Sequence, residues 1–396
     1  MRQNQKRRAL SDSIESESAL ALDCDVLIAG AGPAGCATAI SLAQFAPALR
    51  VVLADAAPPE HLRIGEAVPP PIKPILEHLG LWQRFATDGH CSSYRTLSAW
   101  GSAQLASNEF LLHPHQVGWR LDRARFDAML RQAAIERGAL YVPARVTGAA
   151  RGPDRWSVAC GGGTHTARML VDATGRATAV ARLHGLRPAR EDRLVGCFVH
   201  FEDAGGGHAE VLLETFPDGW WYSAVVPGGR RVVACMSDAD LIGRLRLADL
   251  DRWTEALGQT RHVAALLRQS RPLGRPRLRA AGSQILSGAA ASALIAVGDA
   301  ASCFDPISGQ GILKALRSGI FASYAIADGL CRHDPAGMRR YGRFVKAEFA
   351  AYRTTLRDYY ALEQRWPAHP FWHRRADRER KQNSVPPSRT MQTMQL

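Results

Sequence analysis

The strongest constraint on the fold of this chain is an apolar run, Val26 to Ala29, that ends in Gly30-Ala31-Gly32-Pro33-Ala34-Gly35 and passes into a helix-forming segment. A buried parallel strand that feeds a helix leaves unpaired backbone N–H groups at the helix start, which the peptide dipole makes electropositive. Gly30 permits the tight turn, Gly32 lets the backbone approach a pyrophosphate, and Gly35 lets helix and strand pack closely. The pattern predicts a dinucleotide site on a doubly wound parallel α/β sheet.

An acidic residue about 20 residues further on should hold a ribose hydroxyl of such a ligand. The next apolar run, Arg50 to Ala54, reads as a second strand and ends at Asp55. A lone G-x-G-x-x-G is weak in a chain with 35 glycines. Here the strand, the helix and the acidic residue occur in the expected order and at the expected spacing, so dinucleotide binding is the favoured interpretation.

Composition sets the class of protein. The 396 residues are 46% hydrophobic, enough for one large domain or two interleaved ones, and no apolar run reaches the ~18 residues that a membrane span needs. The N-terminal residues lack the apolar core of a signal peptide, so we expect a cytoplasmic protein. The eight cysteines form no C-x-x-C pair, which indicates neither a metal site nor a disulfide framework.

The formal net charge of +13 raises the question of nucleic-acid binding. Only five of the 50 basic residues are lysines, and the arginines are spread along the whole chain. Dispersed arginine is typical of a solvated surface, so nucleic acid is not an expected partner. An anionic cofactor or an acidic protein partner explains the sign of the charge equally well.

Between Leu194 and Ser237, four stretches with strand character are joined by glycine- or proline-bearing turns, which predicts an antiparallel sheet inserted into the nucleotide-binding fold. Helical spacing predicts helices over 75–85, 123–137, 248–269, 311–330 and 338–366, and strands are expected over 94–100 and 109–121. The predicted domains are a disordered tail (1–20), a discontinuous nucleotide-binding domain (21–75, 115–190 and 275–330), a substrate domain (76–114 and 191–274), a C-terminal helical region (331–375) and a flexible tail (376–396).

A second glycine-centred segment, Gly298-Asp299 followed by Asp305-Pro306-Ile307-Ser308-Gly309-Gln310-Gly311, completes a recognisable arrangement. Together with Gly30 to Gly35 it resembles FAD-dependent enzymes of the p-hydroxybenzoate hydroxylase type, a superfamily that includes geranylgeranyl reductases and flavin-dependent halogenases. The resemblance covers roughly residues 23 to 365. It implies an FAD-binding three-layer α/β domain with an inserted, mostly antiparallel substrate domain and C-terminal helices.

The resemblance assigns the cofactor contacts residue by residue. The ADP-binding loop of the family is similar to Gly30, Gly32, Pro33, Ala34 and Gly35, and its ribose-binding acid is similar to Asp55. Arg123 matches the family arginine that contacts FAD, and Gly298 with Asp299 matches the pair that binds the ribityl chain. The resemblance also places Arg63 and Val146 among the FAD-binding residues. Pro306 to Gly311 form a rigid, side-chain-poor loop leading into a helix. Backbone N–H groups of Gly309, Gln310 and Gly311 would face the flavin's pyrimidine edge, where negative charge develops on reduction.

The reaction type depends on finer motifs. Where many hydroxylases of this superfamily have Asp-Gly, this chain has Ala173-Thr174-Gly175-Arg176, as in the reductase and halogenase branches. This disfavours direct use of NAD(P)H and favours a separate flavin reductase or electron donor. Gly219-Trp220-Trp221-Tyr222 resembles the halogenase motif G-W-x-W-x-I-P, but Tyr222 replaces its second tryptophan. Lys73 lies one residue early for the halogenase lysine, and Ser308 stands in the place of the catalytic glutamate.

A closer resemblance is to flavoprotein monooxygenases that mature tryptophylquinone cofactors. It is carried by Gly65-Glu66-Ala67-Val68-Pro69-Pro70, by Gly118 to Arg123, by Gly219 to Ala224 and by Tyr359 to Pro367. It implies hydroxylation of an aromatic ring, with indole or tryptophan, free or peptide-borne, as the expected substrate, through reaction of reduced FAD with O2 to a C4a-hydroperoxide. The alternatives are a halogenase, an isoprenoid double-bond reductase and a flavin-carrying binding module.

Few polar residues are candidates for catalysis. Glu66 and Asp305 flank the two flavin-facing loops and can move a proton, while Lys73 lies in a proline-rich loop near the flavin face. Trp220, Trp221 and Tyr222 are expected to wall an aromatic pocket, because aromatic rings stack on aromatic substrates and exclude water. His115 and its neighbour His113 titrate near neutral pH and are candidates for the same pocket.

Overall fold

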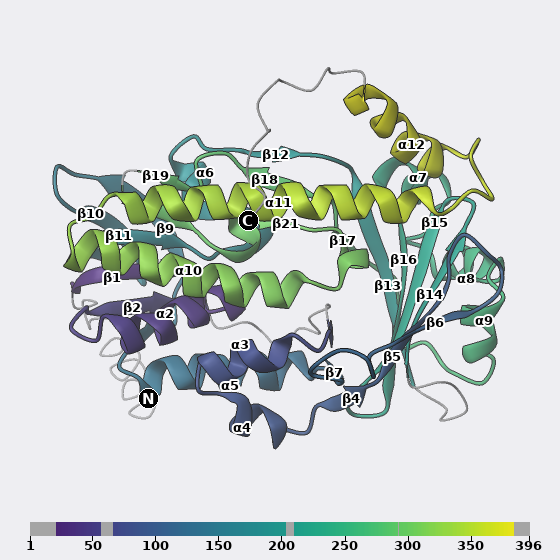
Figure 1. Cartoon of the computed structure of the whole chain (residues 1–396), viewed down its shortest axis with the longest axis horizontal. Helices are drawn as coiled ribbons and strands as arrows, with labels where there is room; N and C mark the ends of the chain where they lie inside the picture. The colour runs from purple at the N-terminus through teal and green to yellow at the C-terminus, as the bar shows by residue number, and fades with distance from the viewer. Residues whose placement is uncertain (1–20, 57–65, 203–209, 292, 384–396) are drawn as a thin grey trace, which may run out of the picture.

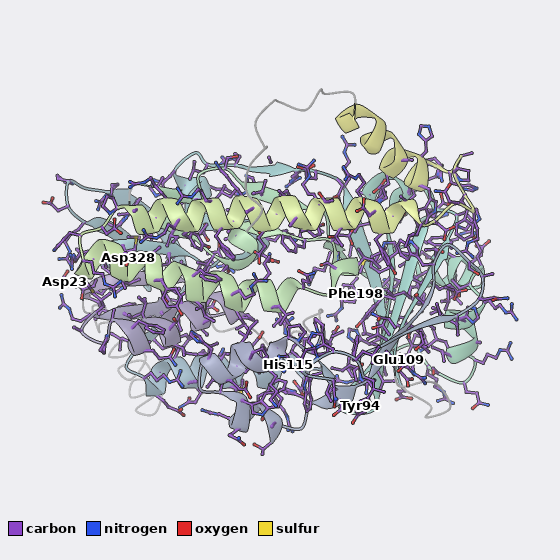
Figure 2. All side chains as sticks on the ribbon, viewed as in Figure 1. Asp23, Tyr94, Glu109, His115, Phe198 and Asp328 are labelled. Carbon is purple, nitrogen blue, oxygen red and sulfur yellow. The ribbon has the colours of Figure 1, made fainter. Side chains whose placement is uncertain are left out.

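The computed structural model describes residues 21–56, 66–202, 210–291 and 293–383. Two large sheets lie at opposite ends of the molecule, and the long helix α11 (Ala336–Ala361) runs past both of them (Figure 1). In the view of Figure 2, Asp23 and Asp328 mark the outer end of the parallel-sheet side, and Tyr94 and Glu109 lie at the antiparallel sheet. This division agrees with the predicted fold class.

The first sheet has eight strands in the order β19-β20-β11-β1-β2-β8, with β10 paired to β11 and β9 paired to β10. Its parallel strands are β1 (Asp23–Ala29), β2 (Val51–Ala54), β8 (Leu140–Val142), β11 (Gly163–Asp172) and β20 (Leu294–Ala296), and its antiparallel members are β9 (Val146–Arg151), β10 (Trp156–Cys160) and β19 (Ala290–Ala291). The central strand β1 is almost wholly buried, as its apolar sequence predicts. All five parallel strands end on one edge, where the predicted loops follow.

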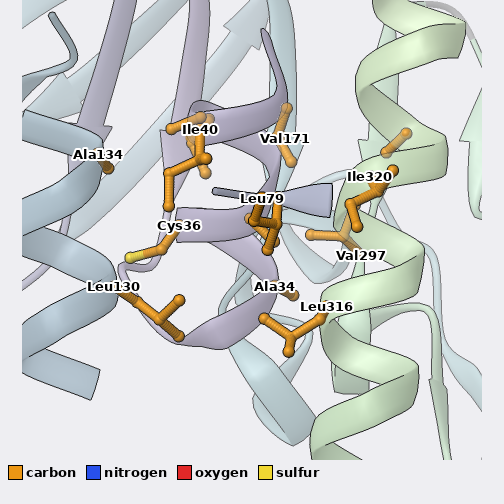
Figure 3. Close-up of a cluster of buried hydrophobic side chains, with 14 of the residues drawn as sticks. Ala34, Cys36, Ile40, Leu79, Leu130, Ala134, Val171, Val297, Leu316 and Ile320 are labelled. Atoms are coloured by element: carbon orange, nitrogen blue, oxygen red, sulfur yellow. The ribbon is translucent and has the colours of Figure 1, made fainter. Parts of the chain in front are cut away.

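Helix α2 (Pro33–Phe45) lies between α5 (Arg123–Glu136) and α10 (Gly311–Cys331) (Figure 3). Leu130 of α5, Cys36 of α2 and Leu316 of α10 belong to one buried apolar cluster. The crossing of α2 and α10 is very close, because a Cβ on Gly319 would stand 2.4 Å from the carbonyl oxygen of Ala34. A small residue at this crossing therefore fixes how α10 approaches the dinucleotide loop.

The second sheet has the order β17-β13-β16-β15-β14-β5-β6 and is mostly antiparallel. Its strands are β5 (Arg95–Ala99), β6 (Ala106–Glu109), β13 (Leu194–Glu202), β14 (Val211–Phe216), β15 (Gly219–Val226), β16 (Arg230–Asp238) and β17 (Arg277–Ala280). Helices α8 (Leu250–Leu257) and α9 (His262–Leu266) contribute side chains to the apolar cluster on one face, whereas Tyr360 of α11 and Phe371 of α12 (Pro370–Asn383) join the cluster on the other. The four predicted strands between Leu194 and Ser237 are thus confirmed.

Short elements connect the two sheets. Two three-stranded sheets consist of β3 (Ala67–Val68), β7 (Gly118–Arg120) and β4 (Cys91–Ser93), and of β12 (Pro188–Arg190), β18 (Gln284–Leu286) and β21 (Ser302–Cys303). The remaining helical elements are α3 (Ile72–His78), α4 (Trp82–Ala86), α6 (Ala179–Leu183), α7 (Ala239–Arg244) and the 3₁₀ turns η1 (Gly175–Ala177), η2 (Gly298–Ala300) and η3 (Pro306–Ser308). Among the described residues, no helix combines the length and apolar character required to cross a bilayer.

Several predicted boundaries are wrong for local reasons. The helix expected over 75–85 is split into α3 and α4, because Gly80 between them takes a φ of +65°. The helix expected over 248–269 is divided into α8 and α9, since the carboxylate of Glu214 binds the backbone N–H groups of residues 261–263 at distances of 2.7 to 2.9 Å and starts a new helix there. The strand expected over 109–121 is reduced to β7 after turns around Pro114. Helix α12 continues beyond residue 376, where a flexible tail was expected.

Candidate active site

The two glycine-centred segments, which are separated by more than 260 residues, meet in space. Gly298, just after β20, has a φ of +60°, and a Cβ there would stand 2.7 Å from the Cβ of Ala34 in the first turn of α2. The backbone N–H of Gly298 donates to Ser318 Oγ at 2.7 Å, which ties this segment to α10. The structure therefore brings the two predicted cofactor segments together.

The first segment has the geometry of a pyrophosphate loop. Gly30 has a φ of +114°, and a Cβ there would stand 2.3 Å from the carbonyl oxygen of Ala173; a Cβ on Gly35 would stand 1.9 Å from the carbonyl oxygen of Gly30. By contrast, a Cβ on Gly32 would meet no atom within 4 Å. No side chain caps α2 at Gly32, and an uncapped helix start beside open space is a place where an anionic group can bind.

The predicted ribose and adenine contacts border this loop. Asp55 follows β2, and its Oδ2 accepts a hydrogen bond from the backbone N–H of Ala31 at 3.0 Å. The acid thus lies beside the glycine loop, as a ribose-binding residue must. Val146 begins β9 with its side chain buried in the apolar cluster under the sheet, so only its backbone is placed to touch a ligand. Arg63 lies outside the described residues.

The second segment lies at a helix start, where two of the three expected donors already have partners: the N–H of Gly309 donates to the Pro306 carbonyl oxygen at 3.0 Å and that of Gln310 to Ser308 Oγ at 3.3 Å. Gly309 has a φ of +61°, and a Cβ on either Gly309 or Gly311 would meet no atom within 4 Å. Residues 309–311 and Pro306 are exposed, and no side chain caps α10 at Gln310. An acceptor group such as a carbonyl oxygen of a flavin ring fits this edge. The contact of Pro306 to Gly311 with an isoalloxazine stays a prediction.

Asp299 stands among positive charges. Its Oδ1 accepts a hydrogen bond from Lys314 Nζ at 2.7 Å, and the charges of Arg176 and Arg123 also act on it. Desolvation is the largest single effect and raises the pKa of the Asp299 carboxyl, but Lys314, Arg176 and Arg123 together lower it more, so the pKa lies below its ordinary value. The structure therefore brings two predicted FAD contacts, Arg123 and Asp299, into one electrostatic cluster. Arg123 also pairs with Asp127 at 3.3 Å.

Asp305 is the buried end of a polar chain that links the flavin loop to the antiparallel sheet. Its Oδ1 accepts from the backbone N–H of Ile307 at 3.0 Å, and its Oδ2 accepts from the hydroxyl of Tyr360 at 2.8 Å. The Tyr360 oxygen in turn accepts from Trp220 Nε1 at 3.0 Å. Burial raises the pKa of Asp305 to about 7, although the hydrogen bonds from Ile307 and Tyr360 oppose the shift. Asp305 can therefore hold or release a proton at neutral pH.

Glu66 belongs to a second polar group at the junction of the sheets. Glu66 is 4% exposed and precedes β3, and its charge acts on Tyr222 of β15. Burial raises the pKa of Tyr222 well above its ordinary value, Glu66 raises it further, and Arg120 of β7 lowers it. The guanidinium of Arg120 donates to the carbonyl oxygen of Ser92 at 3.1 Å. The place of Glu66 and Asp305 beside a substrate pocket stays a prediction.

The three aromatic residues predicted for the pocket do not share one face of the sheet. Trp220 and Tyr222 belong to the apolar cluster that also includes Ala67 and Ile307, next to the two predicted flavin-facing loops. Trp221 points to the other face, where it is fully buried and its ring centroid is 4.9 Å from that of Trp253. Alternation along a strand explains this separation. The structure places Trp221 in the sheet core, away from Trp220 and Tyr222.

Lys73 and His115 lie in more open surroundings. Lys73 Nζ is 3.8 Å from Glu77 Oε1 and 5.3 Å from the ring centroid of Trp82, and its side chain is 40% exposed. His115 lies in the turns before β7, and its ring centroid is 5.6 Å from that of His113. In Figure 2, His115 lies between the labelled residues at the two ends of the molecule. Their catalytic and pocket roles stay predictions.

Two residues of the site were missed by sequence reasoning. Lys314 looked like an ordinary helical lysine, yet it lies at a buried position between the apolar residues Leu313 and Leu316. A charged residue among apolar residues early in α10 was the available signal. Tyr360 was noted only within a motif, because its partner Asp305 is 55 residues away in the sequence. No local pattern predicts that contact.

Comparison with known proteins agrees with this geometry. Residues 25–205 match a family model described as lycopene cyclase protein. The chain is 31% identical over 361 residues to the putative FAD-dependent oxidoreductase LodB of Marinomonas mediterranea, which covers 89% of this chain and 96% of LodB.

Solved structures share the fold. The myxobacterial chondrochloren halogenase CndH superposes with a TM-score of 0.82 at 21% identity, covering 92% of this chain and 89% of CndH. QhpG, a peptidyl tryptophan dihydroxylase essential for tryptophylquinone cofactor biogenesis, superposes with a TM-score of 0.72 at 24% identity, covering 94% of this chain and 81% of QhpG. The predicted FAD-binding α/β fold is confirmed.

Proposed function

Since the chain belongs to the family of FAD-dependent oxidoreductases, we propose that it is a monooxygenase that hydroxylates an aromatic ring, with the indole of tryptophan, free or carried by a polypeptide, as the first candidate substrate. Bound FAD would supply the activation of O2 for this reaction. An external flavin reductase or another electron donor would reduce the flavin. The remaining steps fall to residues of this chain.

The chain holds its cofactor through backbone groups at two helix starts. Residues 32–35 at α2 fit the pyrophosphate, Asp55 fits a ribose, and residues 309–311 at α10 fit the pyrimidine edge of the ring. Asp299 would accept a hydroxyl of the ribityl chain. These contacts would orient the reactive ring toward the antiparallel sheet.

The observation that carries the proposal is the chain Asp305–Tyr360–Trp220. Hydroxylation of an aromatic ring requires loss of a ring proton, and a carboxyl group whose pKa is about 7 can accept one at neutral pH. Tyr360 fixes Asp305 Oδ2, and Trp220 fixes the Tyr360 hydroxyl. The proton acceptor is thereby held rigidly at the base of the flavin loop.

The aromatic cluster beside this chain supports an aromatic substrate. Trp220 and Tyr222 pack on the same side of β15 as Ile307 of the flavin loop and Ala67 beside Glu66. Such rings offer stacking surfaces and keep water out, which protects a reactive oxygen species from loss. The description of QhpG as a peptidyl tryptophan dihydroxylase further supports indole.

The proposal is tested by product analysis under labelled oxygen. Purified protein loaded with FAD and supplied with a flavin reductase is incubated with tryptophan, tryptophan-containing peptides and simple indoles. Mass spectrometry should find one labelled oxygen atom added per hydroxylation, and Asp305→Asn should lower turnover at neutral pH. Flavin oxidation with no labelled organic product from any aromatic compound would contradict the proposal.

The same experiment separates the alternatives. A product that carries chlorine or bromine, appears only with halide and is lost in Lys73→Ala would identify a halogenase instead. Turnover of an isoprenoid double bond without oxygen would identify a reductase. Neither alternative is favoured by the surroundings of Lys73, whose Nζ faces Glu77 and Trp82, or by the tryptophan-rich face of β15.

A further inference from the structure

Lys314 is a buried cation beside the cofactor-binding residues that no step above uses. It lies in the first turn of α10 and is 2% exposed. Its Nζ donates to Asp299 Oδ1 at 2.7 Å and to the carbonyl oxygen of Ser302, and it is 5.0 Å from the ring centroid of Phe304. The ammonium group is therefore fixed from three sides.

Burial of this charge is costly, and the helix does not need it. The neighbouring buried positions of α10 hold Ile312, Leu313 and Leu316, so an apolar side chain would suit the fold at position 314. Replacing a buried ion pair by apolar residues is often neutral or stabilising, which makes such a pair weak evidence for stability. Asp299, its partner, has a 42% exposed side chain. The side chain of Lys314 is therefore buried, whereas part of the Asp299 side chain is accessible to a ligand.

We propose that Lys314 is a positioning residue, which keeps Asp299 ionised and fixed as an acceptor for an FAD hydroxyl and so makes FAD binding insensitive to pH near neutrality. The inference goes beyond the proposed hydroxylation, since it concerns the cofactor alone and holds equally for a halogenase or a reductase. Lys314 itself touches no cofactor atom in this scheme. It acts through the carboxylate of Asp299.

The charges around Asp299 give the direction of the effect. Desolvation raises the pKa of Asp299, and Lys314 is the cation that lowers it most; Arg176 of η1 and Arg123 of α5 contribute less. Cys303 of β21, whose Sγ contacts the Asp299 carbonyl oxygen, has a pKa raised to about 12, mainly by burial, and is neutral. Without the ammonium group, desolvation has lost its strongest opposing charge, and the weaker effects of Arg176 and Arg123 remain.

Among the described residues, the elements packed against this pair also supply the titratable group of Glu348. Helix α2, which packs against α10, contains no charged residue. Glu348 of α11 faces Lys314; burial raises its pKa, while Arg317 and Lys314 lower it. Arg317 pairs with Glu348 at 3.3 Å. Loss of Lys314 would raise the pKa of Glu348 as well, so a variant must distinguish an effect through Asp299 from one through Glu348.

The test measures FAD affinity by flavin fluorescence from pH 6 to 8 in flavin-free protein. We expect wild type to vary by less than about twofold, whereas FAD binding by Lys314→Met should weaken several-fold as the pH falls, because loss of the ammonium group raises the pKa of Asp299. Lys314→Arg should restore the flat profile. Lys346→Met, the same change at an exposed lysine on α11, should behave as wild type. A flat profile and wild-type affinity in Lys314→Met would overturn the proposal.

Replacing Asp299 by asparagine shows whether Lys314 acts through this carboxylate or independently of it. It also guards against a variant that fails to fold because a buried charge has lost its partner. Asp299→Asn should weaken FAD binding without pH dependence, and Asp299→Asn/Lys314→Met should fold without an unpaired charge and bind FAD as Asp299→Asn does. If the double variant binds about tenfold more weakly than Asp299→Asn, Lys314 acts independently of Asp299 and the inference fails. Circular dichroism verifies that each variant is folded.

Discussion

Gly298→Ala probes the contact on which the cofactor site depends. Gly298 has a φ of +60°, and a Cβ there would stand 2.7 Å from the Cβ of Ala34, whereas ordinary contacts begin near 3.4 Å. The left-handed backbone costs about 1–2 kcal/mol for an alanine. Displacing α2 from the segment after β20 adds about 1–3 kcal/mol. We therefore expect a loss of about 2–5 kcal/mol in the free energy of unfolding.

Gly185→Ala is the matched control. Gly185 has a φ of +74°, and a Cβ there would meet no atom within 4 Å. This variant carries the backbone cost of about 1–2 kcal/mol without the clash. The difference between the two variants thus isolates the approach of Gly298 to Ala34.

The assay combines urea unfolding of flavin-free protein with FAD titration. Gly298→Ala should be less stable than Gly185→Ala by about 1–3 kcal/mol and should also bind FAD more weakly, because the two halves of the site move apart. Gly185→Ala should bind FAD as wild type does. Equal stability and equal FAD affinity of the two variants would refute the reasoning.

Three further predictions distinguish effects on the stability of the fold from effects on the proposed site. Gly32→Val should leave stability within about 0.5 kcal/mol, because Gly32 has an extended backbone and open space at its Cβ, yet it should abolish FAD binding in a titration. The pKa of Asp305 is about 7 in the folded protein against an ordinary value of 3.8, so between these pH values the folded state holds a proton that the unfolded state releases. The free energy of unfolding should therefore fall by up to about 4 kcal/mol as the pH rises from 4 to 7. Asp305→Asn should remove this pH dependence in urea titrations. Tyr360→Phe should cost about 1–3 kcal/mol in the same assay, because Trp220 Nε1 and Asp305 Oδ2 both lose a partner, and an unchanged stability would contradict the hydrogen-bonded chain.

The backbone of the cofactor site was predictable from sequence because it depends on local rules. The turn at Gly30, the helix start at Gly32 and the acid at Asp55 follow from strand-to-helix geometry and from a fixed spacing. The loop from Pro306 to Gly311 is equally local. The structure brings these segments together, and their meeting follows from the parallel sheet, whose strands end on one edge.

The side-chain network was not predictable, because its contacts join distant segments. Trp220 and Tyr360 are 140 residues apart in the sequence, and Asp305 joins them from a third element. Trp221 was expected beside Trp220, but strand alternation sends it to the opposite face. Lys314 is spaced like any helical residue, and only the packing of α10 shows that it is buried. The break between α8 and α9 likewise depends on a distant partner, because the Glu214 carboxylate binds the backbone at the start of α9.

Amide hydrogen exchange with and without FAD tests the central claim most directly. One FAD molecule bound to both helix starts should slow exchange in two separate peptides, one covering residues 31–36 and the other residues 309–314, with the same dependence on FAD concentration. Protection of only one of these peptides, or of neither at saturating FAD, would contradict the shared site.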